Sequence, residues 1–150
     1  MIKQLTDLIK TNGTILTLFL LPNKLLKRVL NKLSTFFWKL FLNKCGKNVV
    51  IEYGVFFSHP KNIIIKDNVY IGSGTVFGSE NNQGKVTLSN NVHIGRDCTF
   101  DHTGNITIKE NTLFSANVKI LSHSHGYNPR SKPIAKDLLI PKESARRKVA

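Results

Sequence analysis

Residues 65–77 read IKDNVY-IGSGTV-F, and this stretch decides the fold. Its leading residues Ile65, Ile71 and Phe77 are apolar and lie six residues apart, and the fifth residue of each hexad is small. A period of six matches neither the 3.6-residue period of a helix nor the simple alternation of a strand. It is typical of a solenoid whose coils each contain three short strands.

The same frame recurs in four sets along the chain. The sets begin at Cys45, Ile65, Leu88 and Ile108, which are 20, 23 and 20 residues apart. Three hexads account for 18 residues of each interval, and the additional residues all follow the third leading residue. Loops confined to one corner are expected of stacked repeats.

We therefore predict a mainly β fold, a left-handed parallel β-helix of hexapeptide repeats preceded by an N-terminal helical segment. The predicted β-helix spans about Cys45 to Ile120, within a domain of residues 45–140. Stacking of the coils should align the third leading residues in one inner column, which consists of Phe57, Phe77, Phe100 and Ile120.

Residues 1–44 have helical periodicity. From Leu25 onward the apolar positions form one stripe on a 3.6-residue helix: Leu25, Leu26, Val29, Leu30, Leu33, Phe36, Phe37, Leu40 and Phe41. Lysines and an arginine lie mostly off this stripe, and Pro22 with Asn23 is expected to separate an earlier, weaker helix. Such a helix either lies on an anionic membrane surface or packs its stripe on the rest of the protein or on a partner chain.

The chain is strongly basic, with a formal net charge of +13. This charge favours anionic partners, and residues 1–44 carry eight of the Lys and Arg residues against one Asp. No nucleic-acid recognition motif is present and aromatic residues do not alternate with basic ones, so nucleic-acid binding is a weaker alternative. The two cysteines and the lack of a convincing secretory signal predict a cytoplasmic protein.

Residues 45–139 resemble the hexapeptide-repeat acyltransferases, in particular sugar O-acetyltransferases of the galactoside, maltose and capsule- or lipopolysaccharide-modifying type. The resemblance is carried by IGSG at 71–74, IGRD at 94–97, FSANVKI at 114–120 and LSHSHGYNP at 121–129. It implies acetyl transfer from acetyl-CoA, as co-substrate, to a hydroxyl of a sugar or cell-surface polysaccharide precursor, without a metal. It also implies a homotrimer with sites between subunits, and a basic helix that holds the enzyme at the inner face of the membrane.

The resemblance further implies that a histidine is the general base. Counted from Asn117 without a gap, the family's histidine falls on His125, while His123 takes the role if the chain turns sooner. An imidazole suits this role because its ordinary pKa of ~6.5 leaves a neutral nitrogen near neutral pH. The alternative is that His123 and His125 only begin a polar loop.

Further residues are assigned to substrate or cofactor binding. These are Asn117, Tyr127, Arg130 and Lys132. The three loop residues are expected to cover the acceptor site, with the two cations facing CoA phosphates or an acidic sugar.

The remaining histidines suggest a second enzyme class. The γ-class carbonic anhydrases use the same type of coil and bind metal through three histidines, so His102, His123 and His125 are an alternative ligand set. Against this, nothing in the spacing shows that these three histidines converge on one point, and the long loop after His125 favours the transferase. His59 and His102 are predicted to be separate surface residues about 10 Å apart, because one coil intervenes between them. His93 is expected to be half exposed.

The last residues do not continue the repeat. A fifth coil should begin at Ile140, but its next leading position is Arg146, which cannot be buried cheaply without a partner. Residues 141–150 are therefore predicted to be a basic tail, apparently truncated, and the chain to be a poor or inactive enzyme without the later coils.

Overall fold

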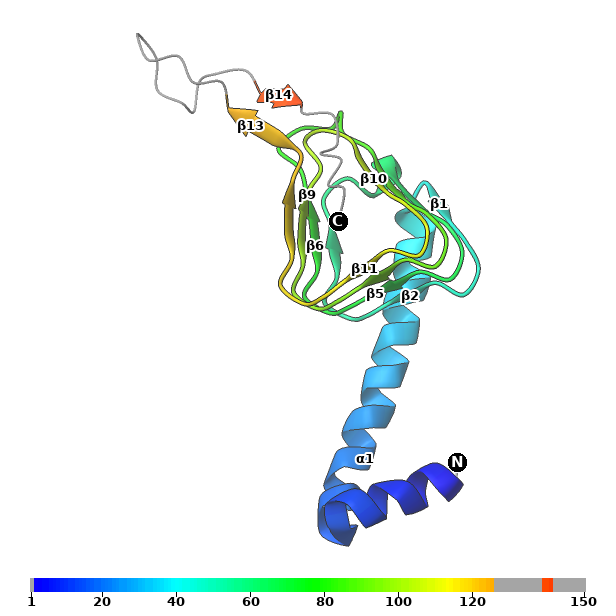
Figure 1. Ribbon diagram of the computed structural model, residues 1–150. Helices are drawn as coiled ribbons and strands as arrows, with labels where there is room; N and C mark the ends of the chain where they lie inside the picture. The colour runs from blue at the N-terminus through cyan, green and yellow to red at the C-terminus, as the bar shows by residue number, and fades with distance from the viewer. Residues whose placement is uncertain (1, 126–138, 142–150) are drawn as a thin grey trace.

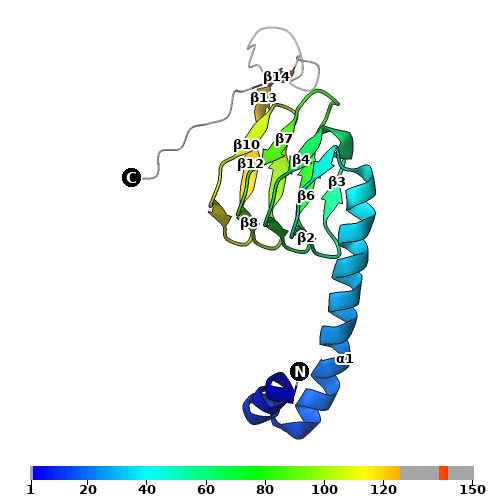
Figure 2. The same ribbon diagram turned by 90° about the vertical axis from the view of Figure 1, so that its right-hand side faces the viewer.

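The computed structural model describes residues 2–125 and 139–141. It consists of a long N-terminal helix, α1 (Ile2–Phe41), and a stack of triangular parallel coils that begins at Lys44 (Figures 1 and 2). The helix crosses the first coil, at the end of the stack opposite to the last coil (Figure 2). The predicted fold class is confirmed.

Each side of the triangle is a four-stranded parallel sheet. The first sheet contains β1 (Lys44–Cys45), β4 (Ile63–Ile65), β7 (Val86–Leu88) and β10 (Ile106–Ile108). The second contains β2 (Val50–Ile51), β5 (Tyr70–Ile71), β8 (His93–Ile94) and β11 (Leu113–Phe114). The third contains β3 (Phe56–Phe57), β6 (Val76–Gly78), β9 (Thr99–Asp101) and β12 (Lys119–Leu121).

The coil is left-handed. In Figure 1 the stack is seen along its axis, and Figure 2 shows that the last coil is nearest to the viewer in that view. The chain passes clockwise from β1 through β2 to the third sheet while it advances toward the viewer. A clockwise path toward the viewer is a left-handed winding.

The leading residues of the hexads form the core, as predicted. Phe57, Phe77 and Phe100 are buried and stack on one another, with ring centroids 4.9 and 4.8 Å apart. Ile120 pairs with Phe100 in the strand register and continues this column. Because neighbouring strands are only ~4.8 Å apart, identical side chains in successive coils meet face to face.

The corners are named here by the sheets that they follow. At the first corner, after the first sheet, four asparagines adopt positive φ, and their side chains form a ladder of hydrogen bonds 3.0–3.1 Å long; they are Asn48, Asn68, Asn91 and Asn111. The tight turn needs a left-handed residue, and asparagine tolerates that conformation. The third corner, after the third sheet, carries the longer loops, including the short 3-10 helix η1 (Pro60–Asn62).

α1 differs from expectation in where it breaks. The helix continues through Pro22, and the non-helical residue lies at Gly13, with φ 73° and ψ 164°. A proline fixes φ near the helical value and removes one hydrogen bond, so a long helix can tolerate it at a cost. In the described part of the chain, no helix has the length and apolar character needed to cross a bilayer.

The coils hold α1 by a face other than its apolar stripe. Thr35 Oγ1 accepts from Ile51 N–H at 2.9 Å and donates to Ile51 O at 3.1 Å, while Trp38 packs edge-on against Phe57. These contacts cover the first coil at β2. The alternative that the stripe packs on the rest of the protein is therefore wrong.

The parallel coils end at Leu121. The next strand, β13 (His123–His125), pairs antiparallel with β14 (Leu139–Pro141). Ile140 therefore lies in a two-stranded antiparallel pair and does not begin a fifth parallel coil. The expected tail, residues 142–150, lies outside the described residues.

Candidate functional site

The third corner of the last two coils brings one of the two candidate bases against a carboxylate. His123 Nδ1 lies 2.8 Å from Asp101 Oδ2, and its Nε2 lies 3.8 Å from Glu80 Oε1. The His123 side chain is 8% exposed, that of Asp101 18%, and that of Glu80 53%. The imidazole is therefore almost fully buried, and the exposed Glu80 carboxylate lies on its Nε2 side.

Asp101 is oriented by its own corner. Its Oδ1 accepts hydrogen bonds from Thr103 N–H at 3.0 Å and from Thr103 Oγ1 at 2.7 Å, which leaves Oδ2 facing His123. Ser122 Oγ donates to Asp101 O at 2.6 Å and accepts from Gly104 N–H at 2.8 Å. These bonds tie the last coil to the coil before it, so the positions of the carboxylate and the imidazole are set by the same stack.

This geometry suits proton transfer at Nε2. Asp101 Oδ2, which can only accept, lies 2.8 Å from Nδ1, close enough to face a proton on that nitrogen. The unprotonated Nε2 is then available to take a proton from a hydroxyl. Asp101 and Glu80 place one carboxylate near each ring nitrogen.

Of the other predicted site residues, Asn117 is described and does not lie at this corner. Asn117 lies at the second corner, with φ 62°, at the opposite end of β12 from His123 (Figure 1). It occupies the left-handed turn position that Gly54 and Gly74 fill in earlier coils, which explains an asparagine there without a ligand. The backbone of His125 lies in β13, but its side chain is outside the description.

Tyr127, Arg130 and Lys132 lie outside the described residues. Their assignment to the acceptor and CoA sites stays a prediction. The same holds for the choice of His125 over His123 as the base.

His59 and His102 are close together, which corrects the prediction of two separate surface residues. Their ring centroids are 6.2 Å apart, and His102 is 0% exposed.

Both ring nitrogens of His102 have protein partners. Nδ1 lies 3.2 Å from Gly84 O, which requires a proton on Nδ1, and Nε2 lies 3.5 Å from Ser58 Oγ. Burial lowers the pKa of His102 below its usual value, although the Gly84 carbonyl opposes this shift. His102 is thus a neutral core residue, and its nitrogens are not directed at an open site.

Metal binding finds no support in the described side chains. Among them, no group of three or more His, Cys, Asp or Glu residues is arranged to hold a metal ion. His102 is one of the three histidines in the alternative carbonic-anhydrase ligand set. Its two ring nitrogens face Gly84 and Ser58. The third member, His125, lies outside the described side chains.

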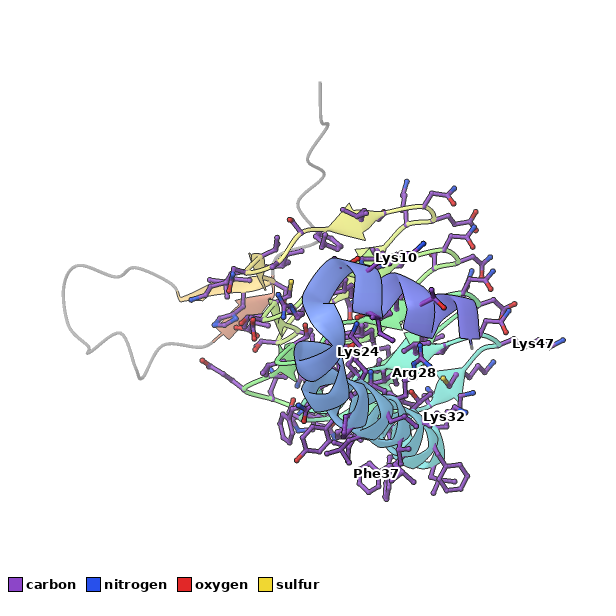
Figure 3. The ribbon with its side chains drawn as sticks, turned by 90° about the horizontal axis from the view of Figure 1, so that it is seen from below. Lys10, Lys24, Arg28, Lys32, Phe37 and Lys47 are labelled. Atoms are coloured by element: carbon purple, nitrogen blue, oxygen red, sulfur yellow. The ribbon has the colours of Figure 1, made fainter. Side chains whose placement is uncertain are left out.

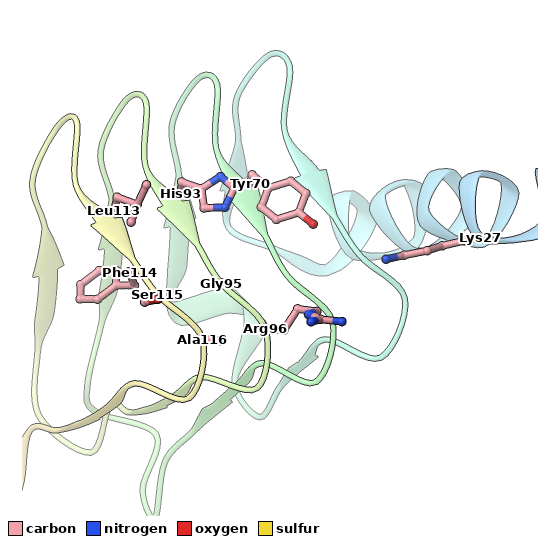
Figure 4. A pocket seen from close by; sticks show the side chains of 9 residues that line it. All are labelled: Lys27, Tyr70, His93, Gly95, Arg96, Leu113, Phe114, Ser115 and Ala116. Atoms are coloured by element: carbon pink, nitrogen blue, oxygen red, sulfur yellow. The ribbon is translucent and has the colours of Figure 1, made fainter. Parts of the chain in front are cut away.

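A hollow lies on the outer face of the second sheet (Figure 4). It has a volume of about 440 Å³, and Tyr70 and His93 form one wall by stacking with centroids 4.5 Å apart. Lys27 and Arg96 place cations at its edge, and Phe114 lines its other end. Such a surface can hold a planar ring or a sugar that carries an anionic group. His123 is not among the residues that line the hollow.

Glu52 links this hollow to α1. Its carboxylate is 2.9 Å from Lys27 Nζ and accepts from Asn31 Nδ2 at 3.1 Å and from Ser73 N–H at 3.0 Å. Burial alone would raise the pKa of Glu52, but the bonds from Lys27, Ser73 and Tyr70 and the Lys27 charge outweigh it and lower the pKa from 4.5 to about 2. Glu52 is therefore a fixed anion that anchors the helix.

Asp101 and Glu80 were not identified from the sequence. Asp101 directly follows the leading residue Phe100, and the stacking frame places it beside Leu121, two residues before His123. That frame was the available signal for the Asp101–His123 contact. Nothing in the spacing points to Glu80, which lies in the irregular loop between β6 and β7.

Comparisons with known proteins give no relative from which a function could be transferred. No protein-family model matches the chain, and neither a curated protein nor a solved structure matches it. The resemblance to hexapeptide-repeat acyltransferases therefore rests on the sequence motifs.

Proposed function

We propose that this chain is an O-acyltransferase that moves an acetyl group from acetyl-CoA to a hydroxyl of a sugar or a cell-surface polysaccharide precursor. The observation that carries the proposal is the contact of His123 Nδ1 with Asp101 Oδ2, 2.8 Å apart, at the third corner of a left-handed β-helix. The motifs at 71–74, 94–97 and 114–129 support the same reaction class.

In the proposed reaction, His123 is the general base instead of His125, because His123 is the histidine that contacts Asp101. Nε2 takes the proton of the acceptor hydroxyl as its oxygen attacks the thioester carbonyl of acetyl-CoA. The tetrahedral intermediate collapses, the carbon–sulfur bond breaks, and the imidazolium returns the proton to the leaving CoA thiolate. Asp101 stays beside Nδ1 during these steps, at the side of the ring opposite to the proton transfer.

The acceptor would approach from the side of Glu80. Asp101 lies beside the Nδ1 edge of the ring, and the exposed Glu80 carboxylate lies 3.8 Å from Nε2. A sugar with several hydroxyl groups can donate one to Glu80 while it presents another to Nε2. We further propose a trimeric, cytoplasmic enzyme, as expected from the family resemblance.

The test is release of CoA thiol from acetyl-CoA, measured with and without a panel of hexoses and amino sugars. Sugar-dependent release should occur in the wild type and fall by roughly 10²-fold or more in His123→Asn. The matched control is His59→Asn, which changes the same residue type away from the proposed base and should retain the wild-type rate. No sugar-dependent release by the wild type, or an unchanged rate in His123→Asn, would overturn the proposal.

A further inference from the structure

The apolar stripe of α1 remains uncovered although the helix is docked. The exposed fractions of its side chains run from 43% at Phe41 to 65% at Phe36. The exposed members are Leu25, Leu26, Val29, Leu33, Phe36, Phe37, Leu40 and Phe41. Contiguous apolar exposure of this kind marks an interaction surface.

The orientation of α1 is fixed by its opposite side. Asn31, Ser34 and Thr35 make hydrogen bonds of 2.9–3.2 Å to Ile51, Glu52 and Tyr53 of the first coil. Lys27 adds an ion pair with the buried Glu52 at 2.9 Å. These contacts hold the helix in one rotation about its axis, so the stripe cannot turn inward without breaking them.

Cations accompany the stripe, and anions do not. No Asp or Glu occurs between Asp7 and Glu52. Arg28 and Lys32 are four residues apart, and Lys32 and Lys39 are seven residues apart, which is about one and two helical turns. The three cations therefore lie on one flank of the stripe. Figure 3 shows Lys24, Arg28 and Lys32 along one side of α1, with Phe37 on the side turned away from the coils.

We propose that the outer face of α1 docks on the surface of an anionic lipid bilayer. The stripe would enter the boundary between headgroups and acyl chains, while the flanking Arg28, Lys32 and Lys39 extend to the lipid phosphates. This proposal does not depend on the proposed acetyl transfer.

A second copy of the chain fits this face less well. Helix pairs normally place opposite charges beside their apolar seam. Two α1 stripes would instead bring together cations of the same sign, with no acidic residue of α1 beyond Asp7 to offset them.

Nucleic acid also fits less well. Phosphates would pair with the cations, but eight exposed apolar side chains would gain little from a polar backbone. Lipid is the anionic partner that uses both parts of the face.

The experiment is co-sedimentation of the full chain with vesicles of phosphatidylcholine alone or with phosphatidylglycerol added. The stripe variant is Leu33→Ser, Phe36→Ser and Leu40→Ser, and the charge variant is Arg28→Gln, Lys32→Gln and Lys39→Gln. Partition onto anionic vesicles should fall at least tenfold in the stripe variant. In the charge variant, partition should fall on the order of 100-fold, since each Lys or Arg near an anionic surface contributes roughly fivefold to binding.

Two matched controls keep the changes comparable. Leu113→Ser with Leu121→Ser removes apolar side chains that are 72% and 67% exposed on the last coil. Lys66→Gln, Lys85→Gln and Lys109→Gln removes three exposed cations of the coils. Both controls should bind anionic vesicles within about twofold of the wild type, and all variants should keep the wild-type melting temperature.

Three results would overturn the proposal. The first is equal binding of the stripe variant and the wild type to anionic vesicles. The second is a stripe variant that alters only the oligomeric state, measured by sedimentation velocity without vesicles, which would assign the face to a second copy. The third is duplex DNA binding that is lost in the charge variant while the wild type does not bind vesicles.

Discussion

Two groups of phenylalanines in this molecule, one in the coils and one on α1, have opposite surroundings. Phe57, Phe77 and Phe100 stack inside the coils at 0–2% exposure, whereas Phe36 and Phe37 on α1 are 65% and 50% exposed. The coils are held together by this apolar column, while α1 is held to them largely by polar side chains around Glu52. The same residue type therefore stabilises the fold in one region and forms a surface in the other.

The largest stability difference should appear between Phe77→Ala and Phe36→Ala. Phe77 stacks between two rings, so its truncation should leave a cavity and lower the free energy of unfolding by about 3–5 kcal/mol. Phe36 is exposed, so its truncation should change that value by about 0.5 kcal/mol or less. Urea denaturation followed by circular dichroism measures both. Similar losses would mean that the stripe is part of the core.

Acid should weaken the attachment of α1 before it affects the apolar column. The pKa of Glu52 is about 2 in the folded protein against an ordinary 4.5, so its contribution is present above pH 4.5 and is lost as the pH falls toward 2. The contribution is at most about 3 kcal/mol. Glu52→Gln should be less stable than the wild type at pH 6, and the difference should shrink between pH 4.5 and 2. A constant difference across this range would contradict the assignment.

A smaller loss should follow a methyl group added between coils. A Cβ at Gly72 would meet the Gly95 carbonyl carbon and oxygen at 2.8 Å, and backbone cannot move aside easily. Gly72→Ala should therefore cost about 1–3 kcal/mol. Gly78→Ala is the matched control, because its nearest neighbour, a Val76 methyl group, is 3.9 Å away. Equal melting temperatures for the two variants would show that the coils are less closely packed than described.

The coils could be predicted because their repeat directly reports burial. A leading residue such as Ile71 must point into a triangle only a few side chains wide, so periodicity and core coincide. The stripe of α1 has an equally regular period, but a helical period shows only which residues share a face. Which face meets the coils depends on Asn31 and Thr35, whose partners are distant in sequence.

The third corner was harder to predict because its loops have no repeat. His59 and His102 approach each other within the corner loops, and the six-residue frame carries no information about corner loops. The contact between His123 and Asp101 depends on the inter-coil register at Leu121. A catalytic histidine could thus be proposed from the motif, but its carboxylate partner required the stacked structure.

The central functional claim is that His123 and Asp101 act as one unit in acetyl transfer. A double-mutant cycle tests it most directly, with kcat measured for His123→Ala, Asp101→Asn and the double variant, and with the melting temperature of each as a folding check. We expect His123→Ala to lower kcat by roughly 10²–10⁴-fold and Asp101→Asn to lower it as well, with the double variant no slower than His123→Ala. Losses that multiply in the double variant, or a wild-type kcat in His123→Ala, would contradict the claim.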